Sequence, residues 1–294
     1  MKKVALVIDN SSGMPEEDIK KLNPQKIIPI SFMINGEEYY ENETMSYSQF
    51  YEFLQDKNTN VSTSQPSAEF IREGYREVLK DYDELIHLIL SSGLSEACNS
   101  ATHISHEEEV EGKVYVVDNG GVAFLNKVPM FKANAMIEQG KSAKEIKGIL
   151  ESEKGDTAAY IAVDTLKYLK KGGRITPLAA AVGSLLNIKP VLQIQGQKLD
   201  AYSKVRGKSA AKKVMLRAIA KDLNERFAEA VKEKRAKIAL AYTGNYDEAL
   251  EWKAEVSEVF PDYELFLAPL SLSVSCHIGQ GALAIVAMDS IEKK

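Results

Sequence analysis

The sequence predicts a two-domain α/β protein, and three observations lead to that class. Short apolar runs alternate with amphipathic segments along the first half, which is typical of a parallel sheet flanked by helices. The chain has 294 residues, enough for two domains of ordinary size. The pattern changes at Lys154-Gly155-Asp156. We therefore expect an N-terminal α/β domain over residues 1–155 and a C-terminal α/β domain over residues 156–294.

The first half contains two kinds of segment. Short runs rich in valine and isoleucine predict strands, and segments with apolar residues every three or four positions predict helices. Strands are expected over residues 4–8, 27–34, 85–90 and 114–117. Helices are expected from near Pro15, over 47–54 and 68–79, after Ser95, and over 122–139 and 142–152. Residues 37–44, after the turn at Asn35-Gly36, are expected to form a surface excursion.

Two loops of the first half concentrate hydroxyl groups in front of a helix. One is Val61-Ser62-Thr63-Ser64-Gln65-Pro66-Ser67, and the other is Ser91-Ser92-Gly93-Leu94-Ser95. Helix capping explains one such loop, and Ser67 is well suited to it. Backbone amides and hydroxyls at a helix N-terminus also bind anions. Because two such loops occur together with a glycine-flanked histidine, the pattern favours a neutral-donor site for a carboxylate or a phosphate.

The second half is expected to form another α/β layer. A strand over 158–163 precedes a helix ending in Lys170-Lys171-Gly172-Gly173, which is a strong termination signal. The segments that follow are a helix of small residues over 177–186, a hairpin of 188–194 and 198–205, a long helix reaching Lys234, a strand over 238–242, a helix through Trp252, and strands over 265–274 and 282–288.

Basic residues gather between Lys198 and Arg217, where Asp200 is the one acidic residue. They are Lys198, Lys204, Arg206, Lys208, Lys212, Lys213 and Arg217. In a chain with a net charge of −5 they create a local positive field suited to a phosphate or an acidic partner. One solvated side of the long helix explains them equally well, so both interpretations stay open.

His277 lies where the apolar run of residues 265–274 gives way to Gly279 and Gly281. Glycine lacks a Cβ, so the backbone can turn sharply and other groups can approach closely. This places the imidazole at an expected strand end, where α/β proteins commonly hold ligand-binding residues. A single histidine is more often a core or turn residue. The two hydroxyl-rich loops shift the balance toward a binding site.

Composition restricts the range of partners and compartments. Hydrophobic residues make up 45% and charged residues 27%, as in an ordinary globular protein. No apolar run approaches the roughly 20 residues that span a bilayer, and the N-terminus turns polar too early for a signal peptide. Two cysteines provide no disulfide framework, and the net charge is −5. We expect a cytoplasmic protein without stable membrane insertion and without nucleic acid as a partner.

Seven motifs together resemble the DegV family of bacterial fatty-acid-binding proteins. They occur in the family's order across nearly the whole chain, which makes the set far more specific than any member. They are Asp9-Asn10-Ser11-Ser12, residues 62–67, residues 91–95, Leu169-Lys170-Lys171-Gly172-Gly173-Arg174-Ile175, Leu186-Asn187-Ile188-Lys189-Pro190-Val191-Leu192, Lys204-Val205-Arg206-Gly207-Lys208 and His277-Ile278-Gly279-Gln280-Gly281.

The resemblance implies one long-chain fatty acid bound in a tunnel between the two domains. Family members of this kind present the acid to a separate fatty acid kinase, which forms the acyl-phosphate, so no catalysis, metal or cofactor is expected of this chain. The residues that would hold the carboxylate are Thr63, Ser64, Ser92, Ser95, His277 and Gly279. Arg174 and Arg206 resemble the arginines that contact the kinase or the phosphorylated head group.

Three positions depart from the family pattern. After Ser95 the family usually continues Gly-Thr-Tyr, whereas this chain has Glu96-Ala97-Cys98. Asn119 stands where serine usually follows Asp118, and Gln280 replaces a proline. Glu96 would place an acid beside the head-group loop, which disfavours carboxylate binding unless its side chain points outward from the start of the helix.

Four other functions are considered for this chain. A serine-dependent ester or lipid hydrolase would pair Ser92 or Ser95 with His277, although the chain has no Gly-x-Ser-x-Gly motif. A metal site would use His103 and His106 with the glutamates that follow, which an exposed helix end explains better. Nucleotide binding lacks a phosphate-binding glycine motif. A plain interaction protein predicts that Thr63 and His277 have no effect on any bound ligand.

Overall fold

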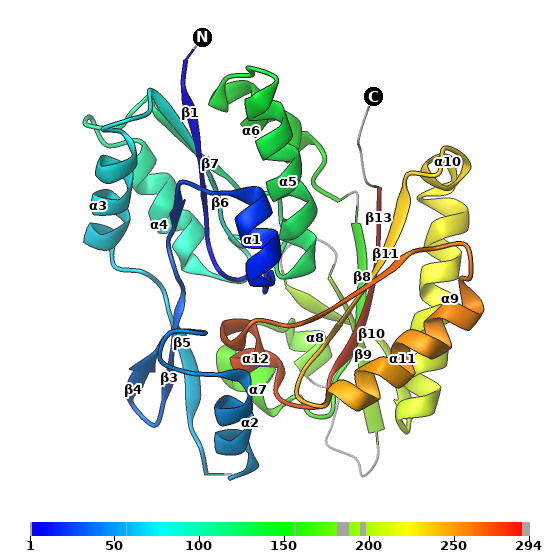
Figure 1. Ribbon diagram of the computed structural model, residues 1–294. Helices are drawn as coiled ribbons and strands as arrows, with labels where there is room; N and C mark the ends of the chain where they lie inside the picture. The colour runs from blue at the N-terminus through cyan, green and yellow to red at the C-terminus, as the bar shows by residue number, and fades with distance from the viewer. Residues whose placement is uncertain (1, 57, 156, 181–187, 195–197, 290–294) are drawn as a thin grey trace.

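The computed structural model describes residues 2–56, 58–155, 157–180, 188–194 and 198–289. Within these ranges the strands form a four-stranded sheet, a six-stranded sheet and a smaller three-stranded sheet. The four-stranded sheet and its helices occupy the upper left of Figure 1, and the six-stranded sheet occupies the right. The predicted α/β class is therefore confirmed. The predicted boundary at 155/156 falls between the two larger sheets and stays a prediction.

The four-stranded sheet is entirely parallel, in the order β2-β1-β6-β7. Its strands are β1 (Val4–Ile8), β2 (Lys26–Ile27), β6 (Glu84–Leu88) and β7 (Val114–Val117). Its helices are α1 (Glu16–Leu22), α3 (Ala68–Val78), α4 (Glu96–Ser105), α5 (Phe124–Glu138) and α6 (Ala143–Ser152). Because side chains alternate along a strand, Ala5 and Val7 pack toward α3 and α4, whereas Leu6 and Ile8 pack toward α1, α5 and α6. Burial on both faces explains the continuous apolar strands.

The three-stranded sheet corrects two predictions. It contains β3 (Ser31–Ile34), β4 (Glu37–Tyr39) and β5 (Val61–Ser64), all antiparallel, with α2 (Tyr47–Gln55) beside it. The single strand expected over 27–34 is wrong: it divides at Pro29, which has no backbone N–H to donate, and its two parts join different sheets. The expected excursion over 37–44 begins as the edge strand β4, across the predicted Asn35-Gly36 turn.

The six-stranded sheet has the order β10-β9-β8-β13-β11-β12 and is antiparallel except for the pair β11 and β12. Its strands are β8 (Thr157–Ala162), β9 (Ile188–Ile194), β10 (Leu199–Arg206), β11 (Ala236–Tyr242), β12 (Leu265–Pro269) and β13 (Leu283–Asp289). The predicted hairpin is present as β9 and β10. The last strand in sequence, β13, lies in the middle of the sheet, between β8 and β11.

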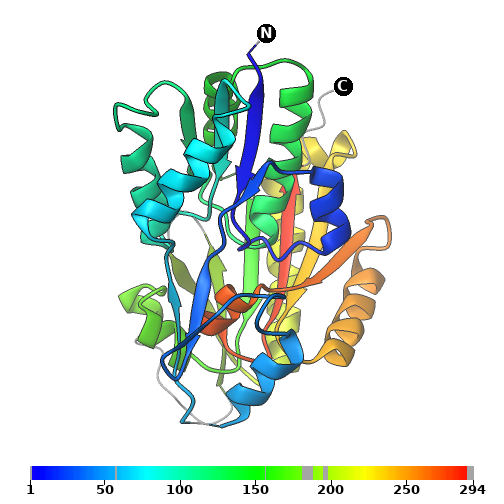
Figure 2. The same ribbon diagram turned by 60° about the vertical axis from the view of Figure 1, so that its left-hand side comes forward.

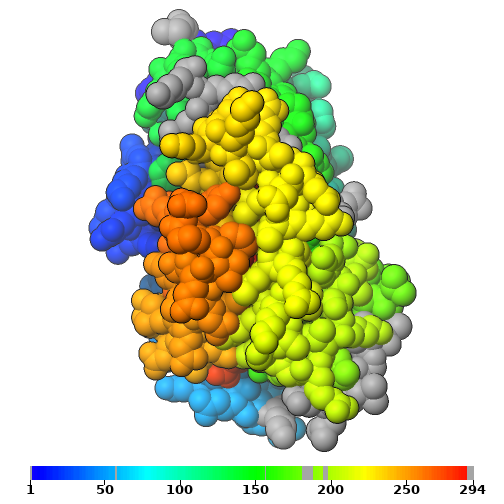
Figure 3. Space-filling model, turned by 90° about the vertical axis from the view of Figure 1, so that its right-hand side faces the viewer, coloured from blue at the N-terminus to red at the C-terminus, as the bar shows by residue number. Residues whose placement is uncertain are grey.

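The outer face of this sheet is covered by α9 (Lys208–Glu225), α10 (Ala228–Lys232) and α11 (Tyr246–Val259), which form the surface seen in Figure 3. Trp252 of α11 is fully buried beneath that layer. The long helix expected to reach Lys234 ends at Glu225, and α10 follows as a separate helix.

The inner face of the six-stranded sheet lies toward the first half of the chain. Three short helices lie there: α7 (Lys167–Gly172), α8 (Pro177–Ala180) and α12 (Leu272–Ile278). The strand expected over 265–274 ends at Pro269, because Ser271 caps a helix by accepting a hydrogen bond from the amide of Val274. The expected helix over 177–186 is described as far as Ala180, and its remainder lies outside the described residues.

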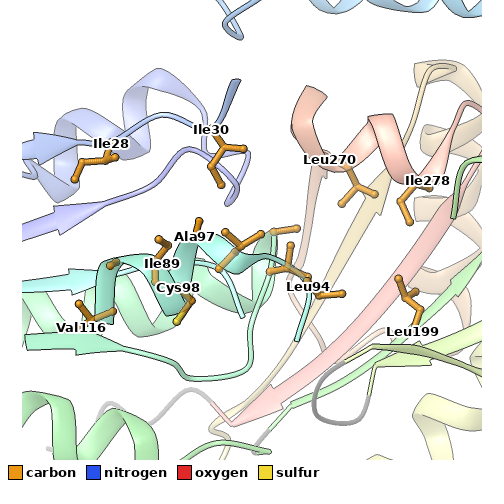
Figure 4. Packing of buried hydrophobic residues seen from close by; sticks show 14 of the residues in the cluster. Ile28, Ile30, Ile89, Leu94, Ala97, Cys98, Val116, Leu199, Leu270 and Ile278 are labelled. Carbon is orange, nitrogen blue, oxygen red and sulfur yellow. The ribbon is translucent and has the colours of Figure 1, made fainter. Parts of the chain in front are cut away.

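Helix α12 joins the two halves. It packs against α7 of the second half and against β3 and β5 of the first half, as Figure 2 shows. A single apolar core runs through this junction. In Figure 4 it extends from Ile28 and Val116 through Leu94 to Leu270 and Ile278. No helix within the described ranges is both long and apolar enough to cross a membrane.

Candidate functional site

A cavity lies at this junction, and its floor is the inner face of the six-stranded sheet. Ile161 of β8 pairs with Ala284 of β13, and Ala159 pairs with Val286, so the four residues form two adjacent rows. Their neighbours in sequence face the opposite way and pack under α9 and α11. The floor is therefore a smooth surface of apolar side chains.

The other walls come from distant parts of the chain and are also mostly apolar. The first half contributes Ile30, Leu90 and Leu94 from loops and Phe124 from the start of α5, and α12 contributes Ile278 and its neighbours. The cavity has a volume of about 110 Å³. Ligand pockets typically measure roughly 300–1,000 Å³, so a larger occupant must displace part of this lining.

A small group of polar side chains lines the cavity: Thr63, Ser95, Arg174, Ser273 and His277. Thr63 Oγ1 and His277 Nε2 lie 2.9 Å apart, within hydrogen-bond distance. Thr63 belongs to β5 and His277 to α12, so the packing of α12 on β5 creates this contact. The prediction that His277 lies at a strand end is wrong, since it occupies the last turn of a helix.

The environment of His277 keeps its imidazole neutral at physiological pH. Burial, together with the positive charge of Arg174, lowers its pKa from 6.5 to about 4. The ring packs over Gly172, where a Cβ atom would lie 2.3 Å from His277 Nδ1. The double glycine predicted only as a helix end therefore has two roles. Gly173 adopts the left-handed cap with φ +71°, and Gly172 leaves room for the imidazole.

Arg174 is half-buried at the same end of the cavity. Its Nε donates to the carbonyl of Leu94 at 2.9 Å, and its Nη1 donates to the carbonyl of Gly172. Among the described contacts, none pairs this guanidinium with a carboxylate. A partly desolvated cation held by carbonyl groups and beside an apolar space attracts an anion, and a guanidinium suits a carboxylate in particular.

The two hydroxyl-rich loops contribute unequally. Ser95 lines the cavity and caps α4, its Oγ accepting from the amide of Ala97 at 3.2 Å. Ser92 lies outside the lining, where its Oγ donates to Asp118 Oδ2 at 2.6 Å. Ser64 also lies outside the lining, and its hydroxyl donates to the carbonyl of Gln65 at 3.3 Å.

The backbone amide of Gly279 is already engaged, donating to the carbonyl of Ser275 at 2.8 Å. Arg206 lies at the exposed end of β10, away from the cavity lining. Of the basic residues around it, Lys208 and Lys212 form ion pairs with glutamates of α11. Lys204, Lys213 and Arg217 are exposed like Arg206.

The three departures from the family pattern lie outside the lining of the cavity. Glu96 is exposed and accepts a hydrogen bond from Asn99 at 2.9 Å. Asn119 Oδ1 accepts from the amide of Gly121 at 2.9 Å. Gln280 packs against Gly244 on the surface. Each side chain has a local structural partner, so none introduces an acid into the cavity.

Other constellations considered from the sequence have different surroundings. For the hydrolase alternative, neither Ser92 nor Ser95 has a described hydrogen bond to His277. The hydroxyl of Ser92 donates to Asp118, and the hydroxyl of Ser95 caps α4. Glu107 and Glu109 pair with Arg72 and Arg76. Over the described ranges, no three histidine, cysteine, aspartate or glutamate side chains gather closely enough to hold a metal ion.

The sequence did not single out Ser273 or Phe124 among the residues of the lining. Ser273 is buried, lines the cavity and shares a hydrogen bond with Ser271 at 3.1 Å. Phe124 begins α5 directly after Ala123, whose positive φ of 53° is unusual for a residue with a Cβ. Nothing in the sequence indicated which side chain at the start of α5 would be directed inward.

Known proteins similar to this chain share its full length. A family model described as an uncharacterised protein, DegV family, matches residues 3–290. A DegV domain-containing protein of Listeria innocua is 30% identical over 286 residues, which cover 96% of this chain and 97% of that protein.

Two solved structures show the same fold. One is a DegV family protein from Thermus thermophilus described as binding fatty acid; it is 27% identical, has a TM-score of 0.85, and covers 98% of this chain and 99% of its own. The other is the fatty acid binding protein DegV from Bacillus subtilis, 27% identical with a TM-score of 0.81, which covers 98% of this chain and 100% of its own.

Proposed function

The chain belongs to the DegV family, and from that premise we propose that it binds one long-chain fatty acid in the cavity between its two halves. Its similarity over the full length to the Thermus thermophilus and Bacillus subtilis fatty acid binding proteins supports the ligand class. The free, buried cysteines, Cys98 and Cys276, suit a reducing cytoplasm, where we propose that it acts.

The observation that carries the proposal is the combination of an apolar cavity with polar groups suited to one carboxylate. Thr63 and His277 lie 2.9 Å apart, and Arg174 supplies a positive charge beside them. A carboxylate buried without hydrogen bonds costs several kcal/mol, so the head group would be held at this end. The hydrocarbon tail would lie over the floor of β8 and β13, where it makes only apolar contacts.

The roles of the individual residues follow from their surroundings. The Thr63 hydroxyl would donate to the carboxylate, the neutral His277 would position that hydroxyl or donate directly, and Arg174 would neutralise the charge. Ser95, at the start of α4, would add a donor close to the carbonyl that holds Arg174. Ser64, Ser92 and the amide of Gly279 have other partners here, and a role for them requires that the ligand displace those contacts.

Mass spectrometry of an organic extract from the purified protein tests the ligand class. We expect close to one long-chain fatty acid per chain. Arg174→Gln should reduce the amount retained, because the carboxylate loses its counter-charge. The control is Arg217→Gln, which removes an exposed arginine of α9. An empty extract, together with no rise in melting temperature when fatty acid is added, would contradict the proposal.

We further propose that the protein presents the bound carboxylate to a partner fatty acid kinase, which forms the acyl-phosphate. Arg206 and the exposed Lys204, Lys213 and Arg217 form a basic surface suited to an acidic partner, on a different part of the chain from the cavity lining. Separation of the two sites allows them to be tested independently.

Arg206→Ala should leave fatty acid binding unchanged and slow acyl-phosphate formation at least tenfold when the kinase from the same cell and ATP are supplied. The rate should recover partly in Arg206→Lys, which keeps the charge but not the bidentate geometry. Loss of fatty acid binding in Arg206→Ala, or an unchanged rate of phosphorylation, would contradict the proposed role of Arg206 in kinase recognition.

A further inference from the structure

The side chain of Phe124 lies between the cavity and a second apolar space. Phe124 lines the cavity and also lines a groove on the outside of the protein, between α5 and the six-stranded sheet. The groove has an apolar base formed by Val128, Phe131, Phe266 and Met288. Figure 1 shows α5 beside β8 and β13, the strands that form the cavity floor. The ring of Phe124 therefore separates a buried apolar space from an exposed one.

We propose that Phe124 is a gate at the tail end of the cavity, and that acyl chains too long for the cavity displace it and extend along the outer groove. The inference rests on the proposed fatty acid function and assigns a determinant of chain length. The occupant of the groove is the distal part of the same hydrocarbon tail.

The floor is continuous from the cavity into the groove. Ala284, Val286 and Met288 alternate along β13 and face the same side of the sheet; the first two line the cavity, and Met288 lines the groove. Phe124 packs on Val286 and Met288 in one apolar cluster. A tail that follows β13 therefore meets apolar side chains between the two spaces, and Phe124 is the one among them that lines both.

Contacts from the outside hold that ring in place. The rings of Phe124 and Phe266 have centroids 6.2 Å apart, and Lys127 Nζ lies 5.4 Å from the first centroid and 5.9 Å from the second. Lys127 also pairs with Asp18 of α1 at 2.6 Å. Phe266 is 37% exposed, whereas Phe124 is 8% exposed. Phe266 therefore lies at the surface, where its side chain can rearrange without opening the core.

The backbone beside the gate is under strain. Ala123 has φ 53° and ψ −132°, a conformation that residues with a Cβ rarely adopt. Asn126, on the first turn of α5, is buried, and neither of its side-chain polar atoms has a hydrogen-bond partner among the described residues. Both features disfavour the closed arrangement locally, so a movement of this turn relieves strain while it opens the cavity.

The size of the cavity points to the same requirement. At about 110 Å³ it is smaller than typical ligand pockets, so a long tail must move some part of the lining. Most of the lining belongs to strands or to the shared core, where rearrangement is costly. Phe124 differs because an apolar groove lies immediately behind it.

The test compares the binding of saturated fatty acids of increasing length, from lauric to behenic acid, after removal of any copurified lipid. Wild-type protein, Phe124→Ala and Phe266→Ala are each titrated with the whole series. Phe70→Ala, which removes an exposed phenylalanine of α3, is the matched control. In Phe124→Ala we expect the longest acids to bind roughly tenfold more tightly relative to palmitic acid, the gain expected from burying about two further methylene groups.

Phe266→Ala should shift the preference in the same direction by a smaller factor, because the gate loses its outer support but remains in place. This variant changes a partly exposed residue and decides the question if Phe124→Ala does not fold. A wild-type length preference in folded Phe124→Ala, or in Phe266→Ala when that variant decides, overturns the gate while leaving the proposed function intact. If wild-type protein binds no member of the series, the proposed function fails and the gate fails with it.

Discussion

Two histidines, the fully buried His87 and the partly buried His277, have similar partners and very different surroundings. His87 lies on β6 with its Nδ1 2.7 Å from the hydroxyl of Tyr75, and burial lowers its pKa to about 3. His277 lies 2.9 Å from the hydroxyl of Thr63, with its pKa lowered to about 4. Each imidazole is therefore neutral at physiological pH and close to one hydroxyl group.

The difference lies in what else each ring contacts. His87 is fully enclosed between core residues, and its Nε2 has no hydrogen-bond partner among the described residues. His277 faces the cavity and lies close to the cation Arg174. The comparison shows that a depressed pKa and a hydroxyl partner do not identify a binding site. The proposed site at His277 differs from His87 in its adjacent space and in the uncompensated charge of Arg174.

The largest expected effect concerns acid stability, to which both histidines contribute. Because each folded pKa lies below the unfolded value of 6.5, the unfolded state takes up protons first as the pH falls. Their stabilising contribution is complete above pH 6.5 and is lost toward pH 4 for His277 and pH 3 for His87. At 1.36 kcal/mol per pKa unit, the contribution is about 5 kcal/mol for His87 and about 3 kcal/mol for His277.

Urea unfolding at a series of pH values measures these contributions in wild type, His87→Gln and His277→Gln. Each variant should show a shallower loss of stability in acid. Saturating fatty acid should reduce the loss of stability in acid in wild type and in His87→Gln, but not in His277→Gln. The reason is that a bound carboxylate offsets the charge of Arg174 and raises the pKa of the His277 imidazole. If the free energy of unfolding depended on pH equally in all three proteins, neither histidine would contribute to acid stability as described.

The second effect concerns space at His277. In Gly172→Ala the new methyl group would lie 2.3 Å from Nδ1, so the imidazole must leave the position in which it contacts Thr63. We expect fatty acid affinity to fall roughly 100-fold, or about 2.7 kcal/mol. Gly148→Ala, on α6 with nothing near the added methyl group, should bind normally. Normal binding by Gly172→Ala would mean that the position of His277 is unimportant.

The smallest expected effect distinguishes the hydroxyl partner of His277, Thr63, from that of His87, Tyr75. Thr63→Val keeps the shape of the side chain and removes its donor, so affinity should fall roughly tenfold with little change in stability. Tyr75→Phe should lower the free energy of unfolding by about 1 kcal/mol and leave affinity unchanged. Isothermal titration and urea unfolding of both variants measure the two quantities. If the two variants behaved alike, the histidines would not differ as described.

Local patterns predicted most strands and helices, and they failed where tertiary contacts decide. The run of residues 265–274 is apolar throughout, so its length and composition resemble a strand. The helix within it depends on the cap at Ser271, a signal that the apolar composition concealed. Likewise, strand 27–34 has alternating residues on both sides of Pro29, and only the sheet pairing shows that it divides.

In the candidate site, too, the sequence predicted some features and tertiary contacts decided the others. The family motifs pointed to Thr63, Ser95 and His277 as carboxylate ligands and to Arg174 as a kinase or phosphate contact, and all four line the cavity. Sequence alone could not separate Ser95 from Ser92, because both follow β6 within one loop. The separation comes from Asp118, at the end of the neighbouring strand β7, which binds Ser92. The gate at Phe124 is equally invisible in sequence, since it depends on what lies behind the ring.

The central place of β13 has a consequence for biosynthesis. Strands β8 and β11 flank β13, so neither can complete its pairing until β13 has emerged from the ribosome. The same strand supplies Ala284 and Val286, so a nascent or truncated chain lacks part of the cavity floor. Such long-range pairing folds slowly and leaves apolar edges exposed meanwhile. Removal of β13 should therefore produce an aggregation-prone product that quality control removes, and the proposed lipid loading would require β13 to be in place.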